Sequence, residues 1–233
     1  MVKVVKFGGS SLASAEQFEK VGNIIRADKA RKYVVPSAPG KRNSKDTKVT
    51  DMLYACYALA EEGKEFRVPL MKIKDRYDSI INGLQLKLSL DEEFKVIAEN
   101  FKAKAGSDYA ASRGEYLNGI IMANYLGYTF IDSAEVIFFD EEGNFDAETT
   151  NKVLSAKLAE CETAVVPGFY GANPDGSVRT DLIKLAMIRV EQALNGNFPD
   201  AQLLLQVHDE LIVECPEEIA TEVAALVSRE MQG

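Results

Sequence analysis

The chain has 233 residues, which is enough for one large domain or two small ones. Hydrophobic residues make up 46% and charged residues 27%, as in a globular protein that buries a core, and the formal net charge is −9. This charge gives no reason to expect nucleic acid or an anionic membrane as a partner. The cysteines Cys56, Cys161 and Cys215 have no metal-like spacing and favour a reducing compartment. Without a secretory h-region or an apolar stretch long enough to span a bilayer, the sequence predicts a cytoplasmic protein.

The charge is distributed unevenly along the chain. Residues 1–179 have a net charge of −2, whereas residues 180–233 have a net charge of −7. The step coincides with a change of motif described below. We therefore expect one unit at residues 1–179 and a second unit at residues 180–233.

The first predicted element is a strand, because the apolar run at residues 2–7 ends in the turn-forming pair Gly8 and Gly9. Ser14 then offers an N-cap, and apolar residues recur at helical spacing as far as Ile25. A strand, a tight turn and a helix follow one another here.

The second predicted strand is at residues 33–36, and a polar, basic loop follows at residues 41–48. Thr50 is a candidate N-cap for the next helix, which runs towards Gly63.

The middle of the chain reads as three helices between residues 67 and 127, with Gly127 as a helix stop. Residues 128–132 and 136–139 are predicted strands, and residues 140–144 are a turn between strands.

A helix at residues 147–160 and a buried strand at residues 163–168 complete this alternation. Strands that alternate with helices predict an α/β fold with a mostly parallel sheet sandwiched by helices.

The pattern changes at Asp181, where a helix with apolar residues over much of its surface begins. A β-hairpin is predicted at residues 201–215 around His208 and Asp209, and a last helix follows Pro216. The second unit is thus expected to be a helix–β-hairpin–helix segment.

The Gly-rich turn after the first strand is suited to binding an anion. Gly8 and Gly9 allow a close approach of the backbone, and successive N–H groups form an anion nest. Lys6 can reach a phosphate as a point charge. Taken alone, a Gly-Gly pair after a strand is more often only a turn.

The wider pattern "VKFGGSS" (residues 5–11) resembles the opening of aspartate kinases, in the amino-acid kinase family. Further motifs follow in the order and spacing of that family, namely "VVPSAPGK" (34–41), "KVTDML" (48–53), "SRGEYLNGIIMANYL" (112–126) and "VVPGFYGANPDGSV" (165–178). The resemblance covers residues 1 to about 179.

The resemblance implies that the chain transfers a phosphoryl group from ATP, with Mg²⁺ as cofactor, to the side-chain carboxylate of L-aspartate. It implies that this reaction is a step in amino-acid biosynthesis, including that of lysine. It implies that the ATP phosphates are bound by Lys6, Gly8, Gly9 and Ser10. It also implies that Lys6 is catalytic. It implies that aspartate is bound by a second group: Ser37, Thr50 and Glu115. Taken without the family, Thr50 could be only an N-cap, Glu115 a solvated helix charge and Ser37 a turn residue.

The chain departs from the family after residue 179. Aspartate kinases continue with a second Gly-rich segment, Arg-Gly-Gly-Ser-Asp, whose Arg and Asp lie in the substrate site, and that segment is absent here. We therefore expect an impaired kinase. From position alone, Arg179 and Asp181 are hypothesised to substitute partly for the lost Arg and Asp.

The segment that replaces it, "DLIKLAMIRVEQAL…AQLLLQVHDELIVECP", resembles the C-terminal palm of family A DNA polymerases. The resemblance implies that Asp209 binds a metal, with Glu210 nearby and His208 near the primer end. Other motifs of that family are missing, and the acidic segment does not suit DNA binding.

The sequence therefore leaves three alternatives open, namely an impaired kinase, a polymerase fragment and a non-catalytic chimera that binds ligands weakly or not at all. The expected partners are ATP and L-aspartate, with neither nucleic acid nor a membrane, and a homo-oligomer is left open.

Overall fold

The computed structural model describes residues 2–180, 190–191, 193–207 and 210–232. Residues 2–180 are built around a four-stranded sheet in the order β1-β2-β4-β3, in which every pair of neighbours is parallel. The strands are β1 (Lys3–Phe7), β2 (Arg31–Pro36), β3 (Thr129–Phe130) and β4 (Ala164–Val165). Because parallel neighbours need crossover connections, helices separate the strands in the chain.

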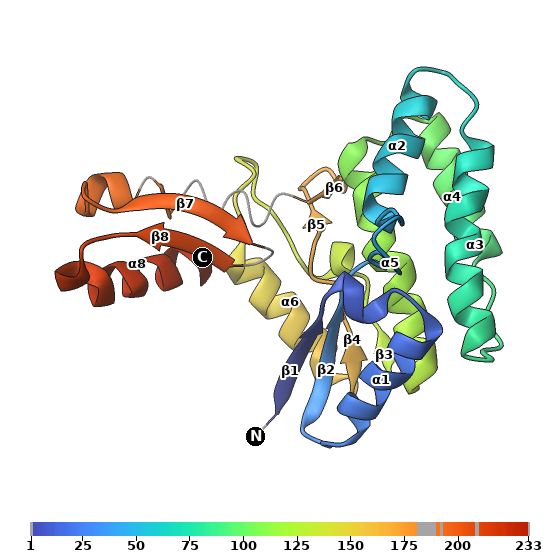
Figure 1. The fold of residues 1–233 in the computed structure, drawn as a ribbon, viewed down its shortest axis with the longest axis horizontal. Helices are drawn as coiled ribbons and strands as arrows, with labels where there is room; N and C mark the ends of the chain where they lie inside the picture. Colours follow the sequence, from blue (N-terminus) through green and yellow to red (C-terminus); the bar gives the residue numbers. More distant parts are fainter. Residues whose placement is uncertain (1, 181–189, 192, 208–209, 233) are drawn as a thin grey trace.

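Helices cover both faces of this sheet (Figure 1). Val34 and Val165 share one core with residues of α1 (Ala15–Arg26) and α5 (Ser107–Leu126). Tyr33 and Ala164, one position earlier on the same strands, pack with residues of α6 (Ala147–Ala159). Successive strand residues point to opposite faces, so α1 and α5 cover one face and α6 covers the other. The predicted α/β class is confirmed.

The edge strand β1 is less well covered than the rest. Val5 and Phe7 pack against the core of α1 and α5, but Val4, which points to the other face, is 66% exposed.

The remaining helices form a layer beside α5. Figure 1 shows them grouped away from the strands, and they are α2 (Val49–Glu61), α3 (Arg67–Gly83) and α4 (Asp91–Lys102). The three helices predicted between residues 67 and 127 are confirmed as α3, α4 and α5. Gly127 ends α5 with a positive φ of 74°, which favours glycine.

Two local predictions were wrong. The N-cap of α2 is Lys48 and not Thr50, because Val49 already belongs to the helix and donates its N–H to the Pro39 carbonyl oxygen. Residues 136–139 do not form a regular strand. They make isolated bridges instead, from Phe138 to Ala172 and from Phe139 to Phe145.

The turn after this segment was predicted correctly. Asp140 accepts a hydrogen bond from the Asn144 N–H at 2.7 Å, and Gly143 has a positive φ. A short antiparallel pair follows further along the chain, β5 (Gly171–Ala172) with β6 (Val178–Arg179).

The C-terminal residues form a hairpin and a helix, as predicted. The antiparallel strands are β7 (Gln202–Val207) and β8 (Glu210–Glu214), and α8 (Ala220–Gln232) follows a short 3₁₀ turn, η3 (Glu217–Ile219). This part has a hydrophobic core of its own, made by Val190, Leu194, Ala201, Val223 and Leu226.

Cys56 alone among the cysteines is buried, and its thiol donates to the Phe66 carbonyl oxygen at 3.4 Å. Desolvation raises the pKa of this thiol to about 11. Cys161 and Cys215 are partly exposed. In the part of the chain that the structure describes, no helix has the length and apolar character needed to cross a bilayer.

Candidate active site at the carboxyl edge of the sheet

Three segments meet where the parallel strands end. Lys6 lies at the end of β1, Ser37 directly follows β2, and Gly168 comes shortly after β4. The Ser37 N–H donates to the Phe7 carbonyl oxygen at 3.0 Å, which joins the first two segments beyond the last strand pair. The carboxyl edge of a parallel sheet is the usual place for a ligand site in such folds.

The Gly-rich turn provides an accessible backbone. Gly8 precedes the short 3₁₀ helix η1 (Gly9–Leu12), and a Cβ placed on Gly8 would meet no atom within 4 Å. Gly9 is enclosed, because a Cβ there would lie 2.6 Å from the Ala38 carbonyl oxygen. Ser10 is exposed on η1. Gly8 thus leaves open space next to backbone N–H groups, and such an arrangement suits an anion.

Lys6 supplies positive charge to the same place. Partial desolvation lowers the pKa of its ammonium group, while the negative charge of Glu115 raises it. Lys6 and Glu115 are therefore close enough to interact electrostatically, although they come from β1 and α5.

Glu115 is the most perturbed carboxyl group of the site. Desolvation raises its pKa from 4.5 to about 7. The Gly168 N–H, which donates to Glu115 Oε2 at 3.2 Å, opposes this shift. Lys6, the Phe169 N–H and the Ser37 side chain also favour the carboxylate. With this pKa, Glu115 can gain or lose a proton near neutral pH. The positive charge of a cationic ligand would favour the ionised carboxylate.

Thr50 lies beside the turn of α5 that carries Glu115. A Cβ on Gly114 would be 3.7 Å from Thr50 Oγ1 and 2.9 Å from the Ala38 Cβ. Gly114 thus allows α2, α5 and the loop after β2 to approach one another. The structure brings Lys6, Ser37, Thr50 and Glu115 together with the Gly-rich turn.

Sequence reasoning missed two contributors to this site. Asn118, one turn after Glu115, is fully buried and donates from Nδ2 to the Ser37 carbonyl oxygen at 2.6 Å. Its spacing from Glu115 on a helix could have indicated a shared face. The backbone N–H groups of Gly168 and Phe169 gave no such signal, because main-chain donors are present at nearly every residue.

The segment that supplies these N–H groups is held at both ends. Ser133 donates to the Pro167 carbonyl oxygen, and the buried Tyr170 hydroxyl donates to Asp132 Oδ1 at 2.7 Å. The Arg113 guanidinium lies 5.3 Å from the centre of the Tyr170 ring. Residues 167–170 therefore have a fixed path past Glu115.

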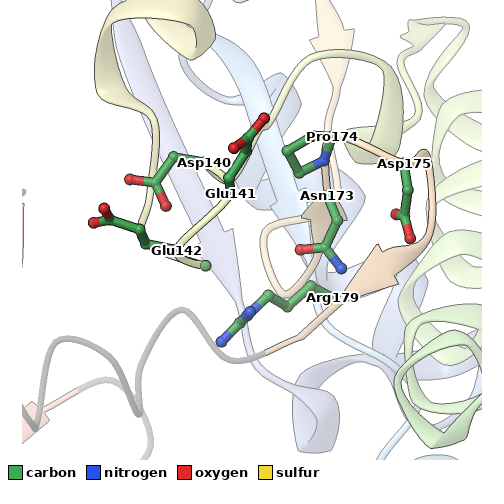
Figure 2. Close-up of a pocket in the computed structure, with 8 residues that line it drawn as sticks. Asp140, Glu141, Glu142, Asn173, Pro174, Asp175 and Arg179 are labelled. Carbon is green, nitrogen blue, oxygen red and sulfur yellow. The ribbon is translucent and has the colours of Figure 1, made fainter.

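Arg179 lies in a different environment. It lines a pocket of about 360 Å³. Figure 2 shows it there with the acidic side chains Asp140, Glu141, Glu142 and Asp175. None of Lys6, Ser37, Thr50 and Glu115 lines this pocket.

Three predicted residues of the second unit cannot be compared with this site. Asp181, His208 and Asp209 lie outside the described residues, and so the structure does not test the metal role predicted for Asp209. Within residues 2–180, 190–191, 193–207 and 210–232, no group of three or more His, Cys, Asp and Glu side chains could hold a metal ion.

Comparison with known proteins identifies two matches along the chain. The model of the amino acid kinase family matches residues 1–187, and the model of DNA polymerase family A matches residues 176–233. Aspartokinase 3 of Bacillus subtilis is 34% identical over 255 residues, which cover 99% of this chain and 54% of that protein.

Solved structures agree with the first match. The crystal structure of Clostridium acetobutylicum aspartate kinase superposes with a TM-score of 0.74 at 45% identity, covering 80% of this chain and 44% of that one. E. coli aspartokinase III in complex with aspartate and ADP has a TM-score of 0.63 at 21% identity, covering 82% and 46%, a likeness that shows the fold alone. The chain thus spans about half the length of the aspartokinases it matches.

Proposed function

Since the chain belongs to the amino acid kinase family, we propose that it is an aspartate kinase-like phosphotransferase. It would transfer the γ-phosphoryl group of ATP to the side-chain carboxylate of L-aspartate, which gives 4-phospho-L-aspartate and ADP. One observation carries the proposal: Lys6, Ser37 and Glu115 converge with the Gly168 N–H at the carboxyl edge of the sheet.

The phosphates of ATP would lie against the Gly-rich turn. The open space at Gly8 admits a phosphate close to the backbone, while Gly9 keeps the turn packed on the loop after β2. Ser10 offers a hydroxyl, and Lys6 neutralises charge on the phosphate oxygens. Two anions must meet in this reaction, so positioning and charge neutralisation are the main contributions of the protein.

L-Aspartate would be held by Ser37, Thr50 and Glu115. Its ammonium group next to Glu115 would favour the carboxylate and lower a pKa that is about 7 in the free protein. The proposal is supported by the 45% identity with Clostridium acetobutylicum aspartate kinase and the 34% identity with Aspartokinase 3 of Bacillus subtilis.

Mg²⁺ would be held mainly by the phosphate oxygens of ATP, as is usual for this ion in phosphoryl transfer. When bound, it supplies further neutralisation of the negative charge on the phosphates.

We also propose that catalysis is impaired. The second Gly-rich segment that follows this region in aspartate kinases is missing from the sequence, and the polymerase-like segment stands in its place from about residue 180. We propose a unit boundary between residues 179 and 180, within the overlap of the two family matches at residues 176–187.

The unpaired thiols support a cytoplasmic location.

The test is to trap aspartyl phosphate with hydroxylamine in the presence of Mg-ATP, and to compare the chain with its Lys6→Ala variant. Product that requires aspartate, ATP and Lys6 is expected. If the chain forms no more hydroxamate than Lys6→Ala, the kinase proposal is wrong. Thermal stabilisation by aspartate or Mg-ADP would then identify a protein that binds without turnover, since ligand at 100 times its Kd adds about 2.7 kcal/mol.

The match of residues 176–233 to family A DNA polymerases supports a second proposal. We infer that the chain is a chimera in which this segment has no polymerase activity of its own, because its net charge is −7 and DNA binding needs the opposite sign. Extension of a primed template by the purified chain, lost in an Asp209→Ala variant, would contradict this.

A further inference from the structure

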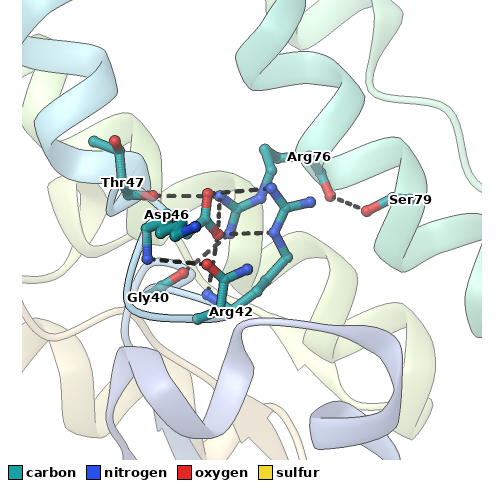
Figure 3. A network of polar contacts seen from close by, with 8 residues as sticks. Gly40, Arg42, Asp46, Thr47, Arg76 and Ser79 are labelled. Carbon is teal, nitrogen blue, oxygen red and sulfur yellow. Dashed lines mark hydrogen bonds and ion pairs between the residues drawn. The ribbon is translucent and has the colours of Figure 1, made fainter.

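Arg76 on α3 is buried, yet it makes polar contacts with the loop between β2 and α2. Figure 3 shows its guanidinium among Gly40, Asp46 and Thr47. It donates to the carbonyl oxygens of Gly40 at 3.0 Å and Thr47 at 3.3 Å, and it pairs with Asp46 Oδ2 at 3.0 Å. One side chain thus binds this loop at three points.

Asp46 is the centre of this network. It also accepts two hydrogen bonds from the Arg42 side chain, at 2.8 and 3.1 Å. The hydrogen bonds from Arg42 and the charge of Arg76 hold the pKa of Asp46 well below its usual range. A buried guanidinium is stable only when it is paired, so the loop must adopt this path for Arg76 to remain in place.

The loop is joined in turn to the Gly-rich turn. The Gly40 N–H donates to the Gly9 carbonyl oxygen at 2.8 Å, while the Gly40 carbonyl oxygen is the one that Arg76 binds. Both sides of Gly40 are therefore fixed. A continuous chain of contacts runs from Arg76 through Gly40 to Gly9, next to the open space at Gly8.

The neighbouring residue Tyr77 acts on the other side of the site. Its fully buried hydroxyl donates to the Gly114 carbonyl oxygen at 2.8 Å, one residue before Glu115. Two successive residues of α3 thus bind the backbone next to the two proposed ligands.

We propose that Arg76 is a positioning residue for phosphate binding: through Gly40 it holds the Gly-rich turn in the conformation that receives the phosphates of ATP. This inference rests on the proposed function. In this proposal Arg76 positions the Gly-rich turn that binds the nucleotide, whereas Tyr77 positions the backbone next to Glu115.

The test compares three variants, Arg76→Lys, Arg42→Met and Tyr77→Phe. Lysine keeps the positive charge but cannot bind Asp46 and two carbonyl oxygens as a planar fork. Arg42→Met is the matched control, because Arg42 also binds Asp46 but does not contact Gly40. If Arg76→Lys does not fold, Asp46→Asn, which removes the anionic partner, takes its place.

Three quantities are measured for each variant. Calorimetry gives the Kd of Mg-ADP and of L-aspartate, and NMR gives the hydrogen-exchange rate of the Gly40 amide. Arg76→Lys is expected to raise the Kd of Mg-ADP about tenfold, to change that of aspartate much less, and to accelerate exchange at Gly40. Tyr77→Phe is expected to raise the Kd of aspartate instead, and Arg42→Met to change neither much.

A purely structural role for Arg76 would give a different result. Equal weakening of both ligands, or Gly40 exchange no faster than in Arg42→Met, would overturn the proposal. If the unmodified chain binds neither ligand, the proposed function fails, and the exchange rate at Gly40 alone decides whether Arg76 holds the turn.

Discussion

The backbones of Gly9 and Gly40 are in direct contact. The Gly40 N–H donates to the Gly9 carbonyl oxygen at 2.8 Å, and a Cβ on Gly40 would lie 2.6 Å from the Gly9 carbonyl carbon. Neither residue can carry a side chain without moving the other segment. The Gly-rich turn and the loop after β2 therefore form one packed unit, although about thirty residues separate them in the chain.

This contact predicts different effects for two adjacent glycines. Gly9→Ala would force the Ala38 carbonyl away, and we expect a loss of about 1–3 kcal/mol in the free energy of unfolding. Gly8→Ala should change that free energy by less than about 1 kcal/mol, because φ at Gly8 is −73° and no atom is near. Its methyl group would instead occupy the space proposed for phosphate. Urea unfolding and Mg-ADP titration of both variants check this, and equal destabilisation by the two would contradict it.

The raised pKa of Glu115 predicts that the free energy of unfolding depends on pH. Its pKa in the folded chain is about 7 and the ordinary value is 4.5. Between these values the folded chain keeps a proton that the unfolded chain has lost. Stability is therefore expected to fall as pH rises from about 4.5 to 7, by at most about 3 kcal/mol from this group.

The check is urea unfolding of the chain and of Glu115→Gln at several pH values. The variant should be more stable than the parent at pH 8 by a margin that shrinks towards pH 5, while other titrating groups cancel in the difference. A difference that does not vary with pH would show that burial does not raise the pKa of Glu115.

Tyr170 should affect the pKa of Glu115 through the segment that carries Gly168. Tyr170→Phe removes the hydrogen bond to Asp132, and we expect a loss of about 1–2 kcal/mol in stability. Residues 167–170 would then hold the Gly168 N–H less firmly. Since that hydrogen bond lowers the pKa of Glu115, its loss should raise this pKa above about 7. Carbon NMR of the Glu115 carboxyl group measures the shift. Tyr128→Phe, which loses only a long contact to the Arg31 carbonyl oxygen, is the control.

The separate core of the C-terminal part predicts a local response to core mutation. Leu194 is 1% exposed in that core, and Leu194→Ala should cost about 2–5 kcal/mol there. Hydrogen exchange should accelerate in β7 and β8 and stay unchanged in β1 and β2. Leu53→Ala, in the core of α1 and α5, should give the opposite pattern. Acceleration of both regions by either variant would mean that the two parts unfold together.

The sequence was sufficient for those features that depend on local pattern. Alternating strands and helices predicted the parallel sheet, and the Gly-rich turn placed Lys6, Gly8 and Gly9 at its edge. Thr50 was misassigned as an N-cap because the start of α2 is set by a tertiary hydrogen bond, from Val49 to the distant Pro39. Residues 136–139 have the composition of a strand but find only isolated bridges.

Long-range polar contacts could not be predicted in the same way. Arg76 lies in the middle of a helix, where an arginine is usually solvated, and nothing near it in sequence indicates that it binds Gly40 and Asp46. The Gly168 N–H reaches Glu115 only because the Tyr170 and Ser133 side chains fix its segment. Such partners become visible only once the chain is folded.

Because Cys56 is buried, chemical labelling of its thiol can report the local separation of α2 from α3. Thiol reagents attack the thiolate, and a pKa of about 11 leaves very little thiolate at neutral pH in a side chain that is also 1% exposed. The partly exposed Cys161 and Cys215 should be labelled first, and the third label should appear only when the layer of α2 and α3 separates. With Cys161 and Cys215 replaced by serine, the rate of labelling would give the free energy of that opening under native conditions, without denaturant and without any ligand.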